Sequence, residues 1–186
     1  FGRDPNDLKM MPGIVVNVGE TKAEAQAKVD FLIDNLHPDV GRWMLGEFLE
    51  TDLPGPALNK PFPMERLPKE PKGSKALFEE LTDFIRQGHT LGHLIRHYAE
   101  KSTGNGITGT PKEIADFMEE WFEARAADGF ILMFPTLPAS LNDFVELVVP
   151  ELRRRGLFRE EYEGTTLRQN LGISTPANRY TAARRG

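Results

Sequence analysis

Three histidines recur at every fourth position in one stretch of the sequence: His89, His93 and His97. A helix would place all three on one face. Imidazoles ligate zinc, so this spacing is compatible with a metal site, with Glu100 as the nearest further ligand. The chain has no cysteine and no HExxH motif, and we favour a solvated polar face without a bound metal. His89 or His93 could instead serve as an acid or base at the mouth of an active site.

A second candidate lies in the turn Thr108-Gly109-Thr110-Pro111. A strand that passes into a helix here would present the helix N-terminus, which can hold an anion. The turn lacks the further glycines and the lysine of a phosphate-binding loop. Thr110 followed by Glu113 also has the pattern of a capping box, and this interpretation is favoured. No Ser-His-Asp grouping and no carboxylate pair stands out, so the residues alone nominate no catalytic group.

The segment 107–135 around this turn predicts a strand, a helix and a second strand. Pro111 suits the first helical position. One apolar face recurs at helical spacing: Ile114, Phe117, Met118, Trp121 and Phe122. After Asp128-Gly129, the run 130–134 contains no polar residue, which is typical of a strand buried on both faces of a parallel sheet. We therefore predict a right-handed βαβ unit.

The chain before this unit predicts another strand and helix. Residues 8–18 read as a strand that bends or bulges at Pro12-Gly13, because proline is awkward in a central strand. Thr21 and Glu24 predict a second capping box at the start of a helix, which His37-Pro38 should end. Residues 39–73 are rich in proline and glycine and contain a short apolar helix near 43–49. They fit a lid or binding loop as well as a plain surface insertion.

Further helices follow in the rest of the chain. Residues 75–100 predict a helix broken at Gly88. Another helix should begin at the N-cap Ser140, kink at Pro150 and end at Gly156, with Arg153, Arg154 and Arg155 in its last turn. The tail beyond Ser174 is expected to wrap the surface or to be disordered.

Three parallel strands, each followed by a helix, leave two sheet edges unpaired. We therefore predict an α/β fold that forms the C-terminal portion of a TIM (β/α)8 barrel, with further strands encoded elsewhere. The predicted division is 1–38 (sixth strand and helix), 39–106 (insertion and helical lid region), 107–156 (seventh strand to eighth helix) and 157–186 (tail).

Composition narrows the function classes. The net charge of −5 and the pI near 5.5 argue against a nucleic-acid binder. The absence of cysteine excludes thiolate catalysis and mildly favours the cytoplasm. No apolar run reaches the roughly 18 residues of a membrane span.

A barrel carries its chemistry at the C-terminal ends of its strands. The residues nominated there as substrate-pocket walls are Asn17, Val18, Thr108, Met133, Phe134 and Pro135. Most are apolar, so they could line a dry pocket but could not themselves perform acid–base chemistry.

Several phrases of the sequence closely resemble one enzyme family. They are GTPKEIAD at 109–116, DGFILM at 128–133, the stretch 148–172 and PANRY at 176–180. The resemblance is to the bacterial luciferase-like flavin monooxygenases, in the branch of nitrilotriacetate monooxygenase component A, dibenzothiophene-sulfone monooxygenase and long-chain alkane monooxygenase. It implies a TIM barrel in which residues 8–18, 107–110 and 130–134 are strands six, seven and eight.

The resemblance also implies a function. Such enzymes use reduced FMN, supplied by a separate NAD(P)H-dependent flavin reductase, and O2 to insert one oxygen atom into a small organic substrate. The resemblance places the insertion 39–100 near the active-site mouth and implies a homo-oligomer in full-length form. The residues that bind FMN are expected in an N-terminal half outside this sequence. The alternative is a truncated, non-catalytic partner or subunit of a barrel protein.

Overall fold

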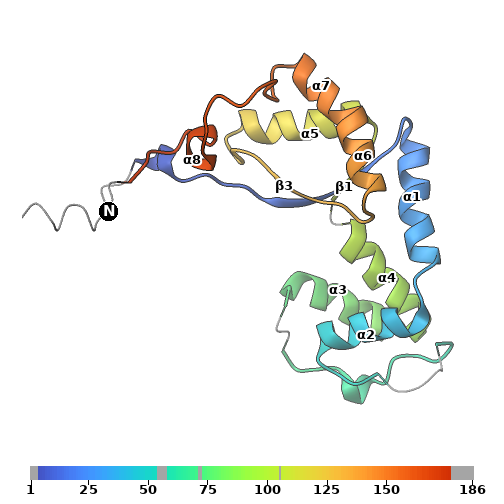
Figure 1. Ribbon diagram of the computed structural model, residues 1–186. Coiled ribbons are helices and arrows are strands. Elements are labelled where there is room, and N and C mark those ends of the chain that lie inside the picture. Colours follow the sequence, from blue (N-terminus) through green and yellow to red (C-terminus); the bar gives the residue numbers. More distant parts are fainter. Residues whose placement is uncertain (1–3, 54–57, 71–72, 105, 177–186) are drawn as a thin grey trace, which may run out of the picture.

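The computed structural model describes residues 4–53, 58–70, 73–104 and 106–176 (Figure 1). A three-stranded parallel sheet with its covering helices forms one unit, and a cluster of helices inserted into the chain forms another (Figure 1). Each unit has its own core of buried apolar side chains. None of the helices in these ranges is long and apolar enough to cross a membrane.

The sheet has the order β2-β1-β3, with all neighbours parallel. Its strands are β1 (Gly13–Val18), β2 (Gly106–Gly109) and β3 (Ile131–Met133). The predicted parallel association of three strands is confirmed. The order is different from that of three consecutive barrel strands, which would place β2 in the centre. Here β1 is central and pairs with β2 along one edge and with β3 along the other.

The strand β1 is shorter than the predicted segment 8–18. It begins directly after Pro12, which has no N–H to contribute to a ladder. The segment before β1 nevertheless already bonds to the segment that leads into β3. The Asp128 N–H donates to the Met10 carbonyl at 2.8 Å, and the Ile131 N–H donates to the Pro12 carbonyl at 3.0 Å. Pro12 therefore delays the start of the regular strand, but the segment before β1 and the segment before β3 remain joined by backbone hydrogen bonds.

The helix α1 (Lys22–Asp34) begins at the predicted N-cap, Thr21, whose hydroxyl accepts from the Glu24 N–H. The Glu24 carboxylate accepts from the N–H of Glu20 rather than of Thr21, so the predicted capping box is not formed in its reciprocal geometry. The prediction that His37-Pro38 ends this helix also needs correction. Helix α1 ends at Asp34, and Pro38 begins the next helix, where its missing N–H is no loss.

The helix α5 (Pro111–Glu123) confirms the capping box predicted from Thr110 and Glu113. The Thr110 hydroxyl accepts from the Glu113 N–H at 3.3 Å, and the Glu113 carboxylate accepts from the Thr110 N–H at 2.9 Å. Proline at the first helical position completes a locally determined start.

Alternate residues of β1 point into a core beneath the helices. Ile14, Val16 and Val18 are buried there against α5 and the C-terminal helical region. The remaining buried members of this core are Ile114, Ala115, Met118, Phe144, Val148, Val149 and Leu152. The helices thus cover one face of the sheet, and the period of two along β1 selects which side chains meet them.

The C-terminal helical region consists of α6 (Ala139–Asp143), the π-helical η3 (Phe144–Val148) and α7 (Val149–Arg154). The predicted N-cap Ser140 is wrong, because Pro138 precedes the helix and Ser140 lies in its first turn. The irregularity expected from Pro150 takes the form of the wider π turn just before it. Gly156 adopts φ +72 after the last turn, in agreement with its predicted capping role.

Arg155 joins this region to α5. Its guanidinium lies 2.8 Å from the Asp116 carboxylate, 2.6 Å from that of Glu119 and 2.8 Å from that of Glu151. Two of these carboxylates belong to α5 and one to α7, so a single side chain ties together the two helices that cover the sheet.

The inserted helices pack on one another below the sheet in Figure 1. They are α2 (Pro38–Leu49), the short η2 (Met64–Arg66), α3 (Lys75–Arg86) and α4 (Leu91–Gly104). The predicted break between the last two is confirmed at Gly88, which adopts φ +79. Helix α4 leads directly into the N-terminal end of β2.

The last short helix, α8 (Leu167–Asn170), is capped by Thr166, and the chain then meets its own beginning. The Ser174 hydroxyl donates to the Asp7 carboxylate at 2.8 Å. The predicted course of the tail can be followed only to residue 176, since residues 177–186 lie outside the described ranges.

Candidate functional site

The sheet face opposite the helices carries a polar pair at the C-terminal ends of two strands. Asn17 of β1 is in register with Thr108 of β2, so both side chains point to the same side. The Asn17 Nδ2 donates to the Thr108 Oγ1 at 3.2 Å. Asn17 is only 5% exposed, and in the described part of the chain Thr82 is the other buried polar residue.

Met133 lies on this same face, because its register partner Val15 is two residues from Asn17. The Met133 side chain is 47% exposed and that of Ile131 is 58% exposed. The prediction that this strand is buried on both faces is therefore wrong. Strand β3 forms an edge of the sheet, and only its Leu132 contacts the helix-covered core. An all-apolar run does not distinguish a strand buried on one face from one buried on both.

The structure separates the other predicted wall residues from this face. Val18 is 3% exposed and belongs to the core beneath the helices. Phe134 packs into the same core, with its ring centroid 5.9 Å from that of Phe144. Pro135 follows β3 and is half-buried. Asn17, Thr108 and Met133 thus share the uncovered face, and the alternation of side chains along a strand is the signal that could have separated the two groups.

His93 and His97 lie on α4, whereas His89 lies in the link between α3 and α4, so one helix does not carry all three histidines as predicted. The rings of His89 and His97 both stack on Phe84, at centroid distances of 3.9 Å and 4.5 Å, and His93 lies 6.0 Å from His89. His97 Nε2 is 3.0 Å from a Glu80 carboxylate oxygen. Within the described ranges, no group of three or more potential ligands is arranged to hold a metal ion.

The position of α4 also separates His89 and His93 from the sheet's C-terminal edge. Helix α4 has 14 residues and is therefore about 21 Å long. Its last residue leads into the N-terminal end of β2, whereas His93 lies in its first turn and His89 precedes it. The structure therefore does not bring them to Asn17 and Thr108.

The turn before α5 is filled by the protein's own carboxylate. Glu113 accepts hydrogen bonds from the Thr110 N–H and from its hydroxyl at 3.1 Å. These bonds, with the nearby Lys22, hold the pKa of Glu113 below its usual value. The helix-cap interpretation of this turn is confirmed, and the N–H groups of Thr110 and Glu113 already have acceptors within the cap.

Sequence reasoning missed Lys28, which secures the C-terminal end of β1. Its Nζ donates to the Val18 carbonyl at 3.0 Å and to the Asp143 carboxylate at 2.9 Å. Glu24 lies 3.0 Å away on the same helix. Burial works to lower the pKa of Lys28, but the hydrogen bonds from its ammonium to Asp143 and Glu24 outweigh it, and the pKa is raised. Only the Glu24–Lys28 spacing was visible in the sequence.

These residues do not compose a complete site for a flavin nucleotide. The uncovered face offers an amide, a hydroxyl and apolar surface. The nearby described cations, Lys22 and Lys28, are already paired with Glu113 and with Asp143 and Glu24. A phosphate group at this face would need donors other than these two lysines.

No family model matches the sequence. Individual proteins do. The chain is 46% identical over 180 residues to nitrilotriacetate monooxygenase component A of Aminobacter aminovorans, covering 96% of this chain and 39% of that protein. It is 40% identical over 183 residues to N-acetyl-S-(2-succino)cysteine monooxygenase of Bacillus subtilis, covering 97% and 41%.

Solved structures of monooxygenases also match this chain over part of their length. EDTA monooxygenase from Chelativorans sp. BNC1 matches with a TM-score of 0.58 and 30% identity, over 93% of this chain and 40% of that one. Long-chain alkane monooxygenase matches with a TM-score of 0.62 and 31% identity, over 92% and 34%.

The fold is thus an α/β unit that matches part of a luciferase-like barrel enzyme. The chain belongs to the luciferase-like flavin monooxygenase family. It spans about two-fifths of the length of the curated relatives described above.

Proposed function

We propose that this chain supplies the C-terminal part of a two-component, FMN-dependent monooxygenase that inserts one atom of O2 into a small organic substrate. The observation that supports this proposal is a parallel sheet in which Asn17 and Thr108 lie together at the C-terminal edge, on the face opposite α5 and α7. Chemistry in barrel enzymes takes place at this edge. The 46% identity to a monooxygenase component supports the reaction class.

In this proposal, residues 8–18, 107–110 and 130–134 are strands six to eight of a closed (β/α)8 barrel. Closure would insert β2 between β1 and β3, which requires the β1–β3 pairing of the chain to be exchanged for new partners. The regular pairing covers three residues of each strand, and the backbone hydrogen bonds from Asp128 to Met10 and from Ile131 to Pro12 extend it. The exposed Ile131 and Met133 would then face the barrel interior.

The chain's own contribution is to shape and dry the reaction site. Asn17 and Thr108 provide a fixed polar spot, and Met133 provides an apolar wall beside it. Reduced FMN, when bound, supplies the activation of O2, and exclusion of water protects that chemistry. The residues that hold the flavin phosphate are proposed to lie outside these 186 residues. A separate NAD(P)H-dependent reductase is the proposed flavin donor, and the full-length assembly is proposed to be a cytoplasmic homo-oligomer.

A second proposal concerns the outer edges of β2 and β3. In the described sheet each of these strands pairs on one side only. Unpaired strand edges are templates for association with another chain. The chain would then act as a non-catalytic partner or subunit of a barrel protein.

Flavin titration separates these proposals. The 186-residue chain alone should show no saturable FMN binding at micromolar concentrations. Co-expression with the N-terminal part of nitrilotriacetate monooxygenase component A should give a hybrid that binds FMN. Micromolar or tighter binding by the chain alone would contradict the proposed location of the phosphate site. A stable hybrid that binds no flavin would favour the non-catalytic partner.

A further inference from the structure

A cavity of about 310 Å³ lies at the opposite end of the sheet from Asn17 and Thr108. Met11 and Gly129 line it, and these residues directly precede the region where β1 and β3 begin. The C-terminal segment that contains Leu157 and Leu171 forms its outer side. We call it the amino-end cavity. It is separate from the reaction edge, and no step of the proposed function uses it.

The wall of the amino-end cavity is mainly apolar and aromatic. Met118 of α5 and Phe144 of the π-helical η3 are buried beside it. Phe130 and Leu132 contribute from the start of β3. Cavities of roughly 150 Å³ lined by such side chains accommodate benzene. This cavity, with about twice that volume, lies at the small end of the range for ligand sites. It can hold an apolar body of roughly ten non-hydrogen atoms.

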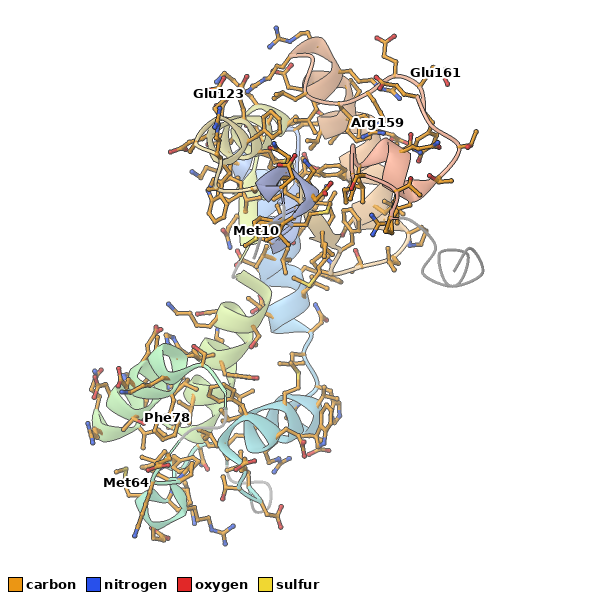
Figure 2. All side chains as sticks on the ribbon, turned by 90° about the vertical axis from the view of Figure 1, so that its left-hand side faces the viewer. Met10, Met64, Phe78, Glu123, Arg159 and Glu161 are labelled. Atoms are coloured by element: carbon orange, nitrogen blue, oxygen red, sulfur yellow. The ribbon has the colours of Figure 1, made fainter. Side chains whose placement is uncertain are left out.

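Two charged side chains, Asp128 and Arg159, lie at the rim of the amino-end cavity, and they differ in their partners. The Asp128 carboxylate accepts from the Met10 N–H at 2.8 Å and lies 3.9 Å from Lys9 Nζ. The Arg159 guanidinium donates from Nη2 to the Asn170 carbonyl at 2.7 Å, and no carboxylate in the described ranges forms an ion pair with it. A guanidinium has five N–H donors, so it retains capacity for an anionic group. Figure 2 shows Arg159 beside the α8 segment that edges the cavity.

We propose that the amino-end cavity binds a small apolar monocarboxylate. The hydrocarbon body would fill the space between α5, β3 and η3, and the carboxylate would take the free donors of Arg159. Charge complementarity selects this class. The rim carboxylate of Asp128 already has an N–H donor, whereas the Arg159 guanidinium has a carbonyl as its hydrogen-bond partner among the described residues. A binding event here would fasten the C-terminal segment to the sheet. The N-terminal ends of barrel strands serve stability rather than chemistry, so stabilisation is the expected effect.

The experiment compares two probes of equal length, octanoate and octanamide, by isothermal titration of the full 186-residue chain. Octanoate should bind with one site per chain, and octanamide at least about tenfold more weakly, since a charge-assisted pair is lost. Arg159→Gln should weaken octanoate binding to the level of octanamide and leave octanamide unchanged. Leu157→Trp, which places an indole in the cavity, should weaken both probes.

Arg153→Gln is the matched control. Arg153 lies 5.7 Å over the Phe158 ring and carries the same charge, but it does not line the cavity. It should leave both affinities within about twofold of the unaltered chain, since rim charges outside the site contribute little. Absence of octanoate binding overturns the proposal. Equal affinity for the two probes, or an equal effect of Arg153→Gln and Arg159→Gln, also overturns it. Arg159 is exposed, so we expect Arg159→Gln to leave the buried core intact, and unchanged octanamide affinity in this variant checks that the cavity keeps its shape.

Discussion

Asn17 and Thr108 lie side by side on β1 and β2, and the Asn17 amide donates to the Thr108 hydroxyl at 3.2 Å. The two residues are 91 positions apart in the chain, with the whole helical insertion between them. Their hydrogen bond therefore reports the register of the β1–β2 pair. It also fixes the orientation of the polar groups that the uncovered sheet face presents at its C-terminal edge.

Removing one partner of the Asn17–Thr108 hydrogen bond should lower the free energy of unfolding more than removing both partners. Thr108→Val leaves the buried Asn17 amide without its acceptor and should cost about 1–3 kcal/mol of unfolding free energy. The double variant Asn17→Leu, Thr108→Val removes the unmet polar group and should recover much of that loss. Urea denaturation measures both. Additive losses in the double variant would show that the hydrogen bond is not the cause.

Gly106→Ala should disrupt the β1–β2 pair. A Cβ at this position would lie 1.9 Å from the Val15 carbonyl oxygen, which is backbone and cannot rotate away. A destabilisation of about 1–3 kcal/mol or more is expected from such overpacking. Gly13→Ala is the matched control in the same sheet, because its Cβ would make contacts of ordinary length, 3.5 Å to the end of the Met133 side chain and 4.0 Å to the Ile131 carbonyl oxygen. Equal denaturation midpoints for the two variants would contradict the register that places Gly106 beside Val15.

Thr110→Ala should destabilise the chain by about 1 kcal/mol, because the N-terminus of α5 loses the hydroxyl that accepts from Glu113 N–H. Thr110→Ser keeps a hydroxyl of similar reach and should retain most of the stability. Thermal denaturation followed by circular dichroism compares the two. The cap would have no energetic role if serine and alanine gave the same melting midpoint.

The lowered pKa of Glu151 leads us to predict that the folded chain loses stability in acid. Hydrogen bonds from Arg154 and then Arg155 lower its pKa from 4.5 to about 2 in the folded chain. Protonation therefore favours the unfolded chain. The stabilisation is complete above about pH 4.5 and is lost as the pH falls toward about 2. Glu151→Gln should flatten the dependence of the melting midpoint on pH in this window.

The control for that experiment is Glu120→Gln, an exposed position on α5 with no ion pair to other described residues. It should preserve the acid slope of the unaltered chain. If Glu151→Gln and Glu120→Gln gave the same slope, the Arg154 and Arg155 contacts would not control acid stability.

Features decided by local chemistry were predictable from the sequence. The capping box of Thr110 and Glu113 and the break at Gly88 depend on neighbouring residues alone, and both are present. Local signals also have more than one meaning. Pro38 was interpreted as a helix stop, although proline suits the first turn of a helix equally well, and here it begins α2.

Features decided by distant contacts were not predictable in the same way. The apolar run that contains Met133 has no period, so its exposed and buried faces could not be assigned. Strand order and the Asn17–Thr108 pair depend on register between segments far apart in the chain. The candidate site was therefore nominated by position at strand ends, and the structure selected which of those residues share a face.

The most direct test of the proposed function is oxygen labelling. The chain would be co-expressed with the N-terminal part of nitrilotriacetate monooxygenase component A and supplied with a flavin reductase, FMN, NADH, nitrilotriacetate and 18O2. We predict that one labelled oxygen atom enters the oxygenated product and the other enters water, and that this product forms only when this chain is present. A folded hybrid that binds FMN yet yields product without label would contradict it.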